Sequence, residues 1–243
     1  MKTDFDLLSV LVRQLQQLWH LLLPTPCLWC SLPVQRFDRQ LCDACQQALP
    51  QLPLALCHYN LLWLPQVARG LTKPRFDELL SVGYYRQPYQ HWLQRWKFAR
   101  DYSAGDLLQR QFVELLQQYQ QQAHKLPQAI LYVPMHRRKQ RQRGFNQAEL
   151  LAKAAAQQLQ LPLLPLLQRK QYQAAQVGLN RKQRQRNLKA AFSLPLTTVL
   201  PTHIALVDDV VTTGATANEI CRLLRRHGAR HISLWTVAVT LSD

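Results

Sequence analysis

Long apolar runs and a recognisable leader are both missing from this sequence. The 243 residues contain no run of about 18 apolar residues, which is the length that a membrane-spanning helix needs. Residues 1–23 carry Asp4, Asp6 and Arg13 among apolar residues at helical spacing. That pattern differs from a secretory signal and favours an amphipathic helix over a membrane anchor. We therefore expect no membrane span and a cytoplasmic location, where cysteines stay reduced.

Acidic residues are also scarce, with 14 Asp and Glu against 30 Lys and Arg, for a formal net charge of +16. The excess is concentrated in residues 136–189, which hold 13 Lys and Arg and a single acid, Glu149. Like charges at this density repel one another unless a counter-charge is near. The segment therefore favours a polyanionic partner, either a diphosphate or a nucleic acid. A solvated basic surface or loop is the alternative.

Four of the six cysteines form two CxxC pairs within one short segment. The pairs are Cys27 with Cys30 and Cys42 with Cys45. This spacing predicts a structural zinc site with four thiolate ligands, since four protein ligands leave no open position for water. Disulfides are the alternative, and a reducing compartment disfavours them. Cys57 and His58 follow twelve residues after the second pair, and we expect a packed cysteine and a surface histidine there.

The most informative segment is residues 204–216, IALVDDVVTTGAT. Its apolar start predicts a buried parallel strand that ends in Asp208 and Asp209. A turn of small and hydroxyl residues follows, and an apolar helical pattern then runs to Gly228. The turn consists of Thr212, Thr213, Gly214, Ala215 and Thr216. A strand, a tight turn and a helix N-terminus together predict an anion site with free backbone N–H groups.

The chemistry of this segment suits a phosphorylated sugar. The threonine hydroxyls can donate to phosphate oxygens, and Gly214 lets the backbone approach the ligand closely. Asp208 and Asp209 suit the vicinal hydroxyls of a ribose or a Mg2+ ion shared with a diphosphate. The segment resembles the motif of type I phosphoribosyltransferases that binds phosphoribosyl diphosphate (PRPP).

A basic segment follows another predicted strand, at residues 129–133. It carries five cations between residues 137 and 143, and residues 144–147 then open a helix. Strands that alternate with helices predict an α/β fold with a mainly parallel sheet and ligands at the carboxyl ends of its strands. Guanidinium groups in this turn could then face the same crevice as Asp208 and bind diphosphate oxygens bidentately.

Taken in order, these motifs resemble the ComF family of competence proteins (ComF/GntX-like), from about residue 26 to the end of the chain. The residues that carry the resemblance are the four cysteines, Trp96-Lys97-Phe98, Val133-Pro134, Arg138, Arg143-Gly144-Phe145-Asn146-Gln147, Arg169, Gln176, Arg181, Arg186-Asn187, Phe192 and the segment VDDVVTTGAT. Many relatives have a further CxxC pair near Cys57, whereas here only Cys57 is present.

The resemblance implies a type I phosphoribosyltransferase-like parallel sheet with flanking helices, plus a small N-terminal four-cysteine zinc module. We expect an amphipathic helix over residues 1–25, the zinc module over 26–60 and the phosphoribosyltransferase-like domain over 76–243. The resemblance also implies Zn2+ as a structural ion, Mg2+ with PRPP, and a role in handling single-stranded DNA during natural transformation or in using DNA as a nutrient. DNA-uptake proteins are expected partners.

The resemblance brings no settled transferase reaction with it. If the protein is an active phosphoribosyltransferase, its acceptor is unidentified. Asp208 and Asp209 would then be the catalytic acids, and residues 212–216 would hold the 5′-phosphate. The candidates for contact with the pyrophosphate are Arg138, Arg143, Arg169 and Arg186. The remaining alternative is a protein-docking module with a vestigial PRPP site.

Overall fold

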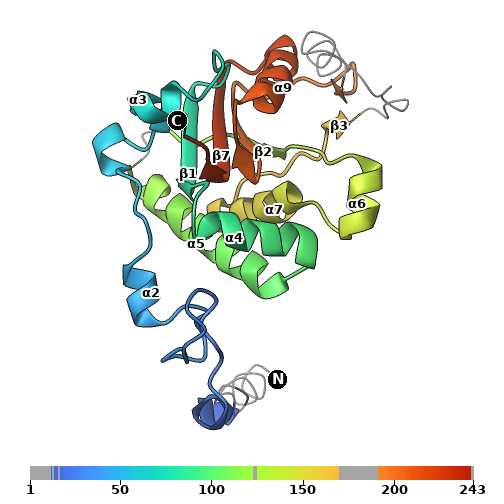
Figure 1. Cartoon of the computed structure of the whole chain (residues 1–243). Coiled ribbons are helices and arrows are strands. Elements are labelled where there is room, and N and C mark those ends of the chain that lie inside the picture. The colour runs from blue at the N-terminus through green and yellow to red at the C-terminus, as the bar shows by residue number, and fades with distance from the viewer. Residues whose placement is uncertain (1–11, 13, 16, 123–124, 170–190, 242–243) are drawn as a thin grey trace, which may run out of the picture. The chain divides into compact units, whose positions relative to one another are not determined.

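A five-stranded parallel sheet organises the larger part of the chain in the computed structural model (Figure 1). The structure describes residues 12, 14–15, 17–122, 125–169 and 191–241. The strands lie in the order β1-β7-β5-β2, and β6 pairs with β7. Their bounds are β1 (Glu78–Tyr84), β2 (Ala129–Tyr132), β5 (His203–Val207), β6 (Val210–Val211) and β7 (His231–Val239). Every pairing in this sheet is parallel, so the carboxyl ends of the strands share one edge.

Helices cover both faces of the sheet. Figure 1 shows α4, α5 and α7 gathered on one side and α3 and α9 on the other. Contacts join α5 to β1 and β7, and α7 to β2 and β5. Their bounds are α3 (Pro65–Ala68), α4 (Tyr89–Gln94), α5 (Tyr102–Gln122), α7 (Gln147–Leu159) and α9 (Ala215–Arg226). The predicted α/β class, a parallel sheet with flanking helices, is confirmed.

Alternation along the strands divides the core between the two faces. Leu206 and Leu234 belong to one apolar cluster with Ile220 and Leu224 of α9. Their neighbour Trp235 points the opposite way, because successive strand residues face opposite sides, and its ring meets that of Tyr119 on α5 at 5.9 Å between centroids. The sheet is therefore buried on both faces, as parallel sheets usually are.

Shorter elements connect this framework. They are η1 (Ala55–Cys57), η2 (Leu61–Trp63), the π-helical turn η3 (Arg95–Ala99), α6 (Arg137–Arg143) and an antiparallel pair, β3 (Gln168–Arg169) with β4 (Phe192–Ser193). None of the helices in the described ranges is long and apolar enough to cross a membrane.

The basic segment after β2 is a helix, where the sequence predicted a turn. The side chain of His136 caps α6 by accepting a hydrogen bond from the Arg138 N–H, at 3.2 Å. Gly144 ends the helix in the left-handed conformation, with φ 89°, and its N–H donates to the Gln140 carbonyl. Defined caps at both ends outweigh the repulsion among five cations in one short helix.

The helical segment that follows β1 is divided in two. It begins as α4 and continues as η3, and Arg100 ends it in the left-handed conformation with φ 53°. A π-helical turn shifts the side chains that follow it relative to an α-helix, and such turns are frequent at functional sites. Here the turn carries Trp96, Lys97 and Phe98.

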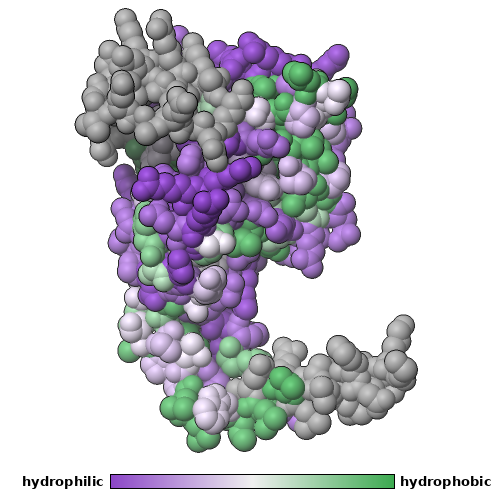
Figure 2. Space-filling view, turned by 90° about the vertical axis from the view of Figure 1, so that its right-hand side faces the viewer, coloured by the Kyte–Doolittle hydropathy of each residue, from purple (hydrophilic) through white to green (hydrophobic). Residues whose placement is uncertain are grey.

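Residues before Gln51 form a separate compact unit. It contains helical residues at 12, 14–15 and 17–22, the helix α2 (Asp43–Gln47), and a bridge between Pro26 and Pro33. Among the described residues of this unit, the buried apolar side chains are Cys27, Val34, Leu41, Cys42 and Leu49. So small a core cannot stabilise an independent unit by apolar burial alone. Figure 2 also shows hydrophobic residues on the surface of this unit. Its exposed large apolar side chains include Leu18, Trp19 and Leu22.

Candidate functional site at the carboxyl edge of the sheet

A small pocket lies where β5 ends and α9 begins. Its volume is roughly 70 Å³. It is lined by Asp208, Val210, Val211, Thr212, Thr213, Gly214, Ala215, Thr216, Ala217 and Leu234. The whole turn that the sequence singled out therefore surrounds one cavity, together with the first of the two acids. The helix N-terminus and its free N–H groups lie at the same place.

A second segment of the chain braces the turn. The Thr72 N–H donates to the Thr213 carbonyl at 2.9 Å, and the Asn218 side chain donates to the Thr72 carbonyl at 2.8 Å. Gly214 has φ 75°, a conformation that costs other residues strain, and it is the N-cap of α9. The turn is thus held in place before any ligand arrives.

The two acids sit in different electrostatic surroundings. The Asp209 N–H donates to Asp208 Oδ1 at 2.8 Å. Burial, followed by the negative charge of Asp209, raises the pKa of Asp208 well above its usual range. Asp209 instead forms an ion pair with Lys97, at 2.7 Å between Nζ and Oδ2, and both side chains are 16% exposed. Among the described residues, Lys97 is therefore the one cation that forms an ion pair with either acid.

Lys97 is the functional candidate that reasoning from the sequence missed. The sequence marked it only as part of Trp96-Lys97-Phe98 and gave it no role. It is brought to Asp209 by the π-helical turn η3, which no periodicity of apolar residues could have indicated. A lone cation in an apolar motif was the only available signal.

The basic helix α6 begins at the same edge of the sheet. The Val133 N–H donates to the Val207 carbonyl at 2.9 Å, so the chain that leaves β2 starts beside the strand that carries Asp208. An open pocket of about 460 Å³ lies against α6, lined by His136, Arg137, Arg138, Arg141 and Gln142. Figure 2 looks at the side of the large unit that carries α6, and that face is predominantly hydrophilic.

Several residues of the Arg143–Gln147 motif have structural partners. The Arg143 guanidinium lies over the Phe98 ring, 5.1 Å from its centroid, and donates to Gln147 Oε1 at 3.3 Å. The Asn146 side chain caps α7 and donates to the Val133 carbonyl at 3.0 Å. Phe145 stacks on Trp96 with centroids 5.9 Å apart. The motif therefore fixes α7 and η3 against the end of β2.

Two predicted arginines lie beyond β2 and α6. Arg169 on β3 is exposed, and its guanidinium lies 5.6 Å from the centroid of the Phe192 ring. Desolvation lowers the pKa of Arg169, and the charge of Asp208 opposes that shift, so the two groups are within electrostatic reach. Arg186 and most of the basic stretch around it lie outside the described residues.

The four cysteines of the small unit converge as their spacing predicted. Their sulfur atoms all lie within 4.8 Å of one another and could hold a metal ion. Burial raises the pKa of the Cys27 thiol, but N–H groups of Cys30, Cys42 and Trp29 outweigh it and bring the pKa down to about 6. Burial and the neighbouring sulfurs raise the pKa of Cys45. Four thiolates this close need a cation among them, so the donor set fits zinc.

The remaining cysteines are packed away from this cluster. Cys57 is 1% exposed in the apolar core of the large unit, and its thiol donates to the Leu54 carbonyl. Cys221 on α9 is fully buried. Neither belongs to a cluster of possible metal ligands among the described residues.

Known proteins resemble this chain in sequence over most of its length. The phosphoribosyl transferase domain family matches residues 146–242. Competence protein F of Haemophilus influenzae is 34% identical over 220 residues, which cover 87% of this chain and 96% of that protein. DNA utilization protein YhgH of Escherichia coli K12 is 33% identical over 231 residues, 91% of this chain and 100% of that protein. The crystal structure of adenine phosphoribosyltransferase from Leishmania tarentolae aligns with a TM-score of 0.36 and 13% identity, over 56% of this chain and 71% of that one.

Proposed function

The chain belongs to the ComF family of competence proteins, and on that basis we propose that it binds PRPP with Mg2+ at the carboxyl edge of its sheet in support of DNA uptake or DNA use. The observation that carries the proposal is the braced turn of residues 212–216, which surrounds a pocket beside Asp208. Backbone N–H groups and three threonine hydroxyls at one helix N-terminus match the needs of a phosphate group.

The acids would serve the sugar or the metal. Lys97 is the one cation that forms an ion pair with these acids among the described residues, so hydrogen bonds from ribose hydroxyls or a divalent cation would stabilise the ionised form of Asp208. These two acids would hold Mg2+, which when bound supplies positive charge to a diphosphate. Arg138 and Arg169 would neutralise the remaining phosphate charge by bidentate hydrogen bonds. Arg143 and Arg186 are the further candidates from the sequence.

We propose a structural zinc ion for the small unit, held by the four cysteines. The convergence of the sulfurs and the small core of this unit support it. A tetrahedral thiolate site would supply the cohesion that apolar burial does not.

The basic surface supports a nucleic-acid partner. Arg137, Arg138, Lys139 and Arg141 form no ion pair within the described ranges, so their charge is available to phosphates. The names of the relatives point to competence and DNA utilization. We propose single-stranded DNA as the polyanion and DNA-uptake proteins as partners.

The binding proposal is tested by ligand-induced stabilisation of the purified full chain. Mg·PRPP should raise the melting temperature of the wild type, because a ligand that binds only the folded state stabilises it. The Asp208→Asn, Asp209→Asn double variant should bind about tenfold or more weakly, since it loses charged contacts. Asp106→Asn, an exposed acid on α5, should bind like the wild type. Equal stabilisation of all three proteins would contradict the assignment of the acids.

A transferase reaction is a separate possibility, because binding does not require turnover. An active enzyme would release pyrophosphate from PRPP when its acceptor is present. The test offers the wild type and the double Asn variant PRPP with a panel of nucleobases and amines. If the site is catalytic, the wild type should release pyrophosphate faster than the variant. Equal rates across the panel would favour a binding role.

A further inference from the structure

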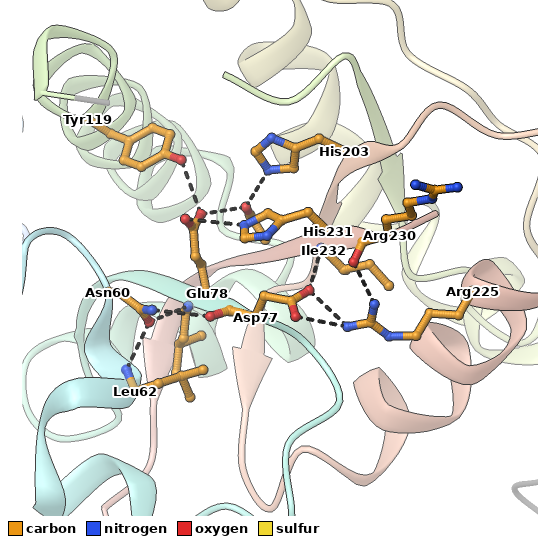
Figure 3. Close-up of polar contacts among 12 residues, drawn as sticks. Asn60, Leu62, Asp77, Glu78, Tyr119, His203, Arg225, Arg230, His231 and Ile232 are labelled. Atoms are coloured by element: carbon orange, nitrogen blue, oxygen red, sulfur yellow. Dashed lines mark hydrogen bonds and ion pairs between the residues drawn. The ribbon is translucent and has the colours of Figure 1, made fainter. Parts of the chain in front are cut away.

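Three titratable side chains meet at the opposite, amino edge of the sheet. Glu78 is the first residue of β1, His203 of β5 and His231 of β7. In the parallel register His203 lies beside His231, and Glu78 lies beside Ser233. Since side chains two residues apart on a strand share a face, all four side chains point to the same side of the sheet, toward α5. Figure 3 shows Glu78, His203 and His231 directed at one another.

The contacts within this cluster are short. Glu78 Oε2 accepts hydrogen bonds from the Ser233 hydroxyl at 2.6 Å and from the Tyr119 hydroxyl at 3.2 Å. Glu78 Oε1 lies 3.2 Å from His231 Nε2, and His203 Nε2 lies 2.9 Å from Ser233 Oγ. The two imidazole rings are nearly perpendicular, with centroids 4.4 Å apart. The carboxylate and both imidazoles can each present a ligand atom within 4.8 Å of the others.

We propose that Glu78, His203 and His231 form a metal site for a divalent first-row transition ion, separate from the four-cysteine site and from the PRPP pocket. Two imidazoles and one carboxylate are a common ligand set for such ions, and they leave positions open for water or a further ligand. Ligand atoms around one ion at about 2.0–2.2 Å can lie as much as about 4.4 Å apart. Small rotations of these side chains therefore bring them into coordination distance.

The surroundings hold the ligands in orientation. Ser233 and Tyr119 fix the Glu78 carboxylate, as second-shell hydrogen bonds do at metal sites. The neighbouring Asp77 is engaged elsewhere, because Arg225 pairs with it at 2.8 Å and the Ile232 N–H donates to it at 2.8 Å. Asn60 adds a brace, since its side chain donates to the Asp77 carbonyl and accepts the Leu79 N–H (Figure 3). Of these two neighbouring acids, Glu78 is therefore the one whose carboxylate faces the imidazoles.

An ion can reach the site from solvent. His203 is buried, but the side chains of His231 and Glu78 are 41% and 31% exposed. One bound ion would join the starts of three strands that are far apart in the sequence. The site would therefore stabilise the sheet at the edge opposite the PRPP pocket.

Metal stoichiometry of the full chain, free of any histidine tag, tests the proposal with Zn2+ as the probe. After loading with Zn2+ and dialysis, the wild type should retain one more zinc ion per chain than the His231→Ala variant. The His91→Ala variant removes an exposed histidine of α4 and should retain as much zinc as the wild type. Equal zinc content in the wild type and His231→Ala would overturn the proposal.

Cobalt spectra identify the ligands independently of stoichiometry. In the Cys42→Ser variant, Co2+ bound at the amino edge should add visible d–d bands to any spectrum from the three remaining cysteines. Adding His231→Ala should remove the d–d bands of the amino-edge site and leave any thiolate-to-metal charge transfer unchanged. A spectrum that is the same with and without His231→Ala would contradict the site. Circular dichroism of each variant checks that it is folded. A second substitution, Glu78→Gln, keeps the size of the side chain and should remove the same bands.

Discussion

At the end of β5, the Asp208 carboxyl group is held in surroundings that disfavour its charged form. Asp208 accepts a hydrogen bond from its neighbour, but burial and the charge of Asp209 raise its pKa. The folded protein therefore disfavours the ionised form that a sugar hydroxyl or metal would need. A ligand that supplies donors or positive charge would relieve this cost. Such strain in the free state is typical of functional sites.

A stability measurement over pH tests this view of Asp208. Because its folded pKa lies above its unfolded pKa, the folded state binds more protons between the two values, and stability falls as the pH rises through that window. Asp208→Asn removes this loss while keeping the acceptor oxygen. The variant should melt a few degrees above the wild type at neutral pH, and the gain should shrink toward zero on acidification below the usual aspartate pKa.

The control for this prediction is Asp106→Asn, whose carboxyl group is exposed on α5. It should show no comparable pH-dependent gain when melting is followed by circular dichroism. A lower melting temperature for Asp208→Asn at neutral pH would show that the acid is structural.

Lys97 supplies the second prediction at this scale. The Lys97→Met variant leaves the half-buried acids without their cation, so it should destabilise the fold by about 2 kcal/mol and weaken Mg·PRPP binding. Lys153→Met is the matched control, because Lys153 pairs with Glu149 one helical turn away in an exposed position. Such exposed pairs are worth less than about 1 kcal/mol. Denaturant titration measures the free energy of unfolding of both variants. Equal losses of this free energy in Lys97→Met and Lys153→Met would contradict the role of Lys97.

Among the elements, some followed from the sequence and others did not. The sequence predicted that residues 144–147 open a helix, and α7 begins at Gln147 with Asn146 as its N-cap. The turn before α9 was also predicted from its small and hydroxyl residues. The helix α6 was missed because its side chains are almost all charged, so no apolar periodicity marked it. The turn η3 was missed because no local sequence signal marks its π-helical geometry. Its Trp96 instead stacks on Phe145, which lies far along the chain.

The same distinction applies to the candidate site. Both acids and the turn of residues 212–216 could be chosen from sequence because they are contiguous. Lys97 and Asp209 are more than a hundred positions apart in the sequence. Glu78 is likewise more than a hundred positions from both His203 and His231. Only the sheet register and the packing of η3 bring them together.

The small N-terminal unit supplies a prediction at the element scale. Cys42 caps α2, with its sulfur accepting the Cys45 N–H. Cys42→Ser can keep that cap but lacks the thiolate that zinc prefers. The variant should lose the zinc ion of the four-cysteine site and the unit should become sensitive to proteolysis. Metal analysis with limited proteolysis checks this, with Cys221→Ser on α9 as a control that should keep the zinc. Unchanged metal content in Cys42→Ser would remove the assignment.

For the whole molecule, the distribution of charge matters more than its total. Most of the net charge of +16 lies in residues 136–189. The described part of that segment includes α6, which follows β2. Strand β2 pairs with β5, and Asp208 directly follows β5. A polyanion attracted to this side would meet cations and the PRPP pocket at one edge of the sheet. The opposite edge carries the histidine cluster, so the two sites should bind independently.

Salt dependence of single-stranded DNA binding tests the role of α6. Replacing Arg137, Arg138 and Arg141 by Gln should weaken binding and reduce the salt slope by roughly 0.7 per lost phosphate contact, or about 2 in all. Replacing Lys153 and Arg226, which are exposed on α7 and α9, by Gln should change the slope less. Fluorescence anisotropy over a range of salt concentrations measures both. An unchanged slope for the α6 variant would place the DNA contacts elsewhere.

The most direct test of the central claim is calorimetric titration of the full wild-type chain with PRPP, once with Mg2+ and once with EDTA. The account predicts saturable binding of one PRPP per chain that requires Mg2+, because the acids and the threonine turn at the end of β5 complement a metal-bound phosphoribosyl ligand. Absence of binding heat in both titrations at millimolar PRPP would contradict the account and favour a docking role for the protein.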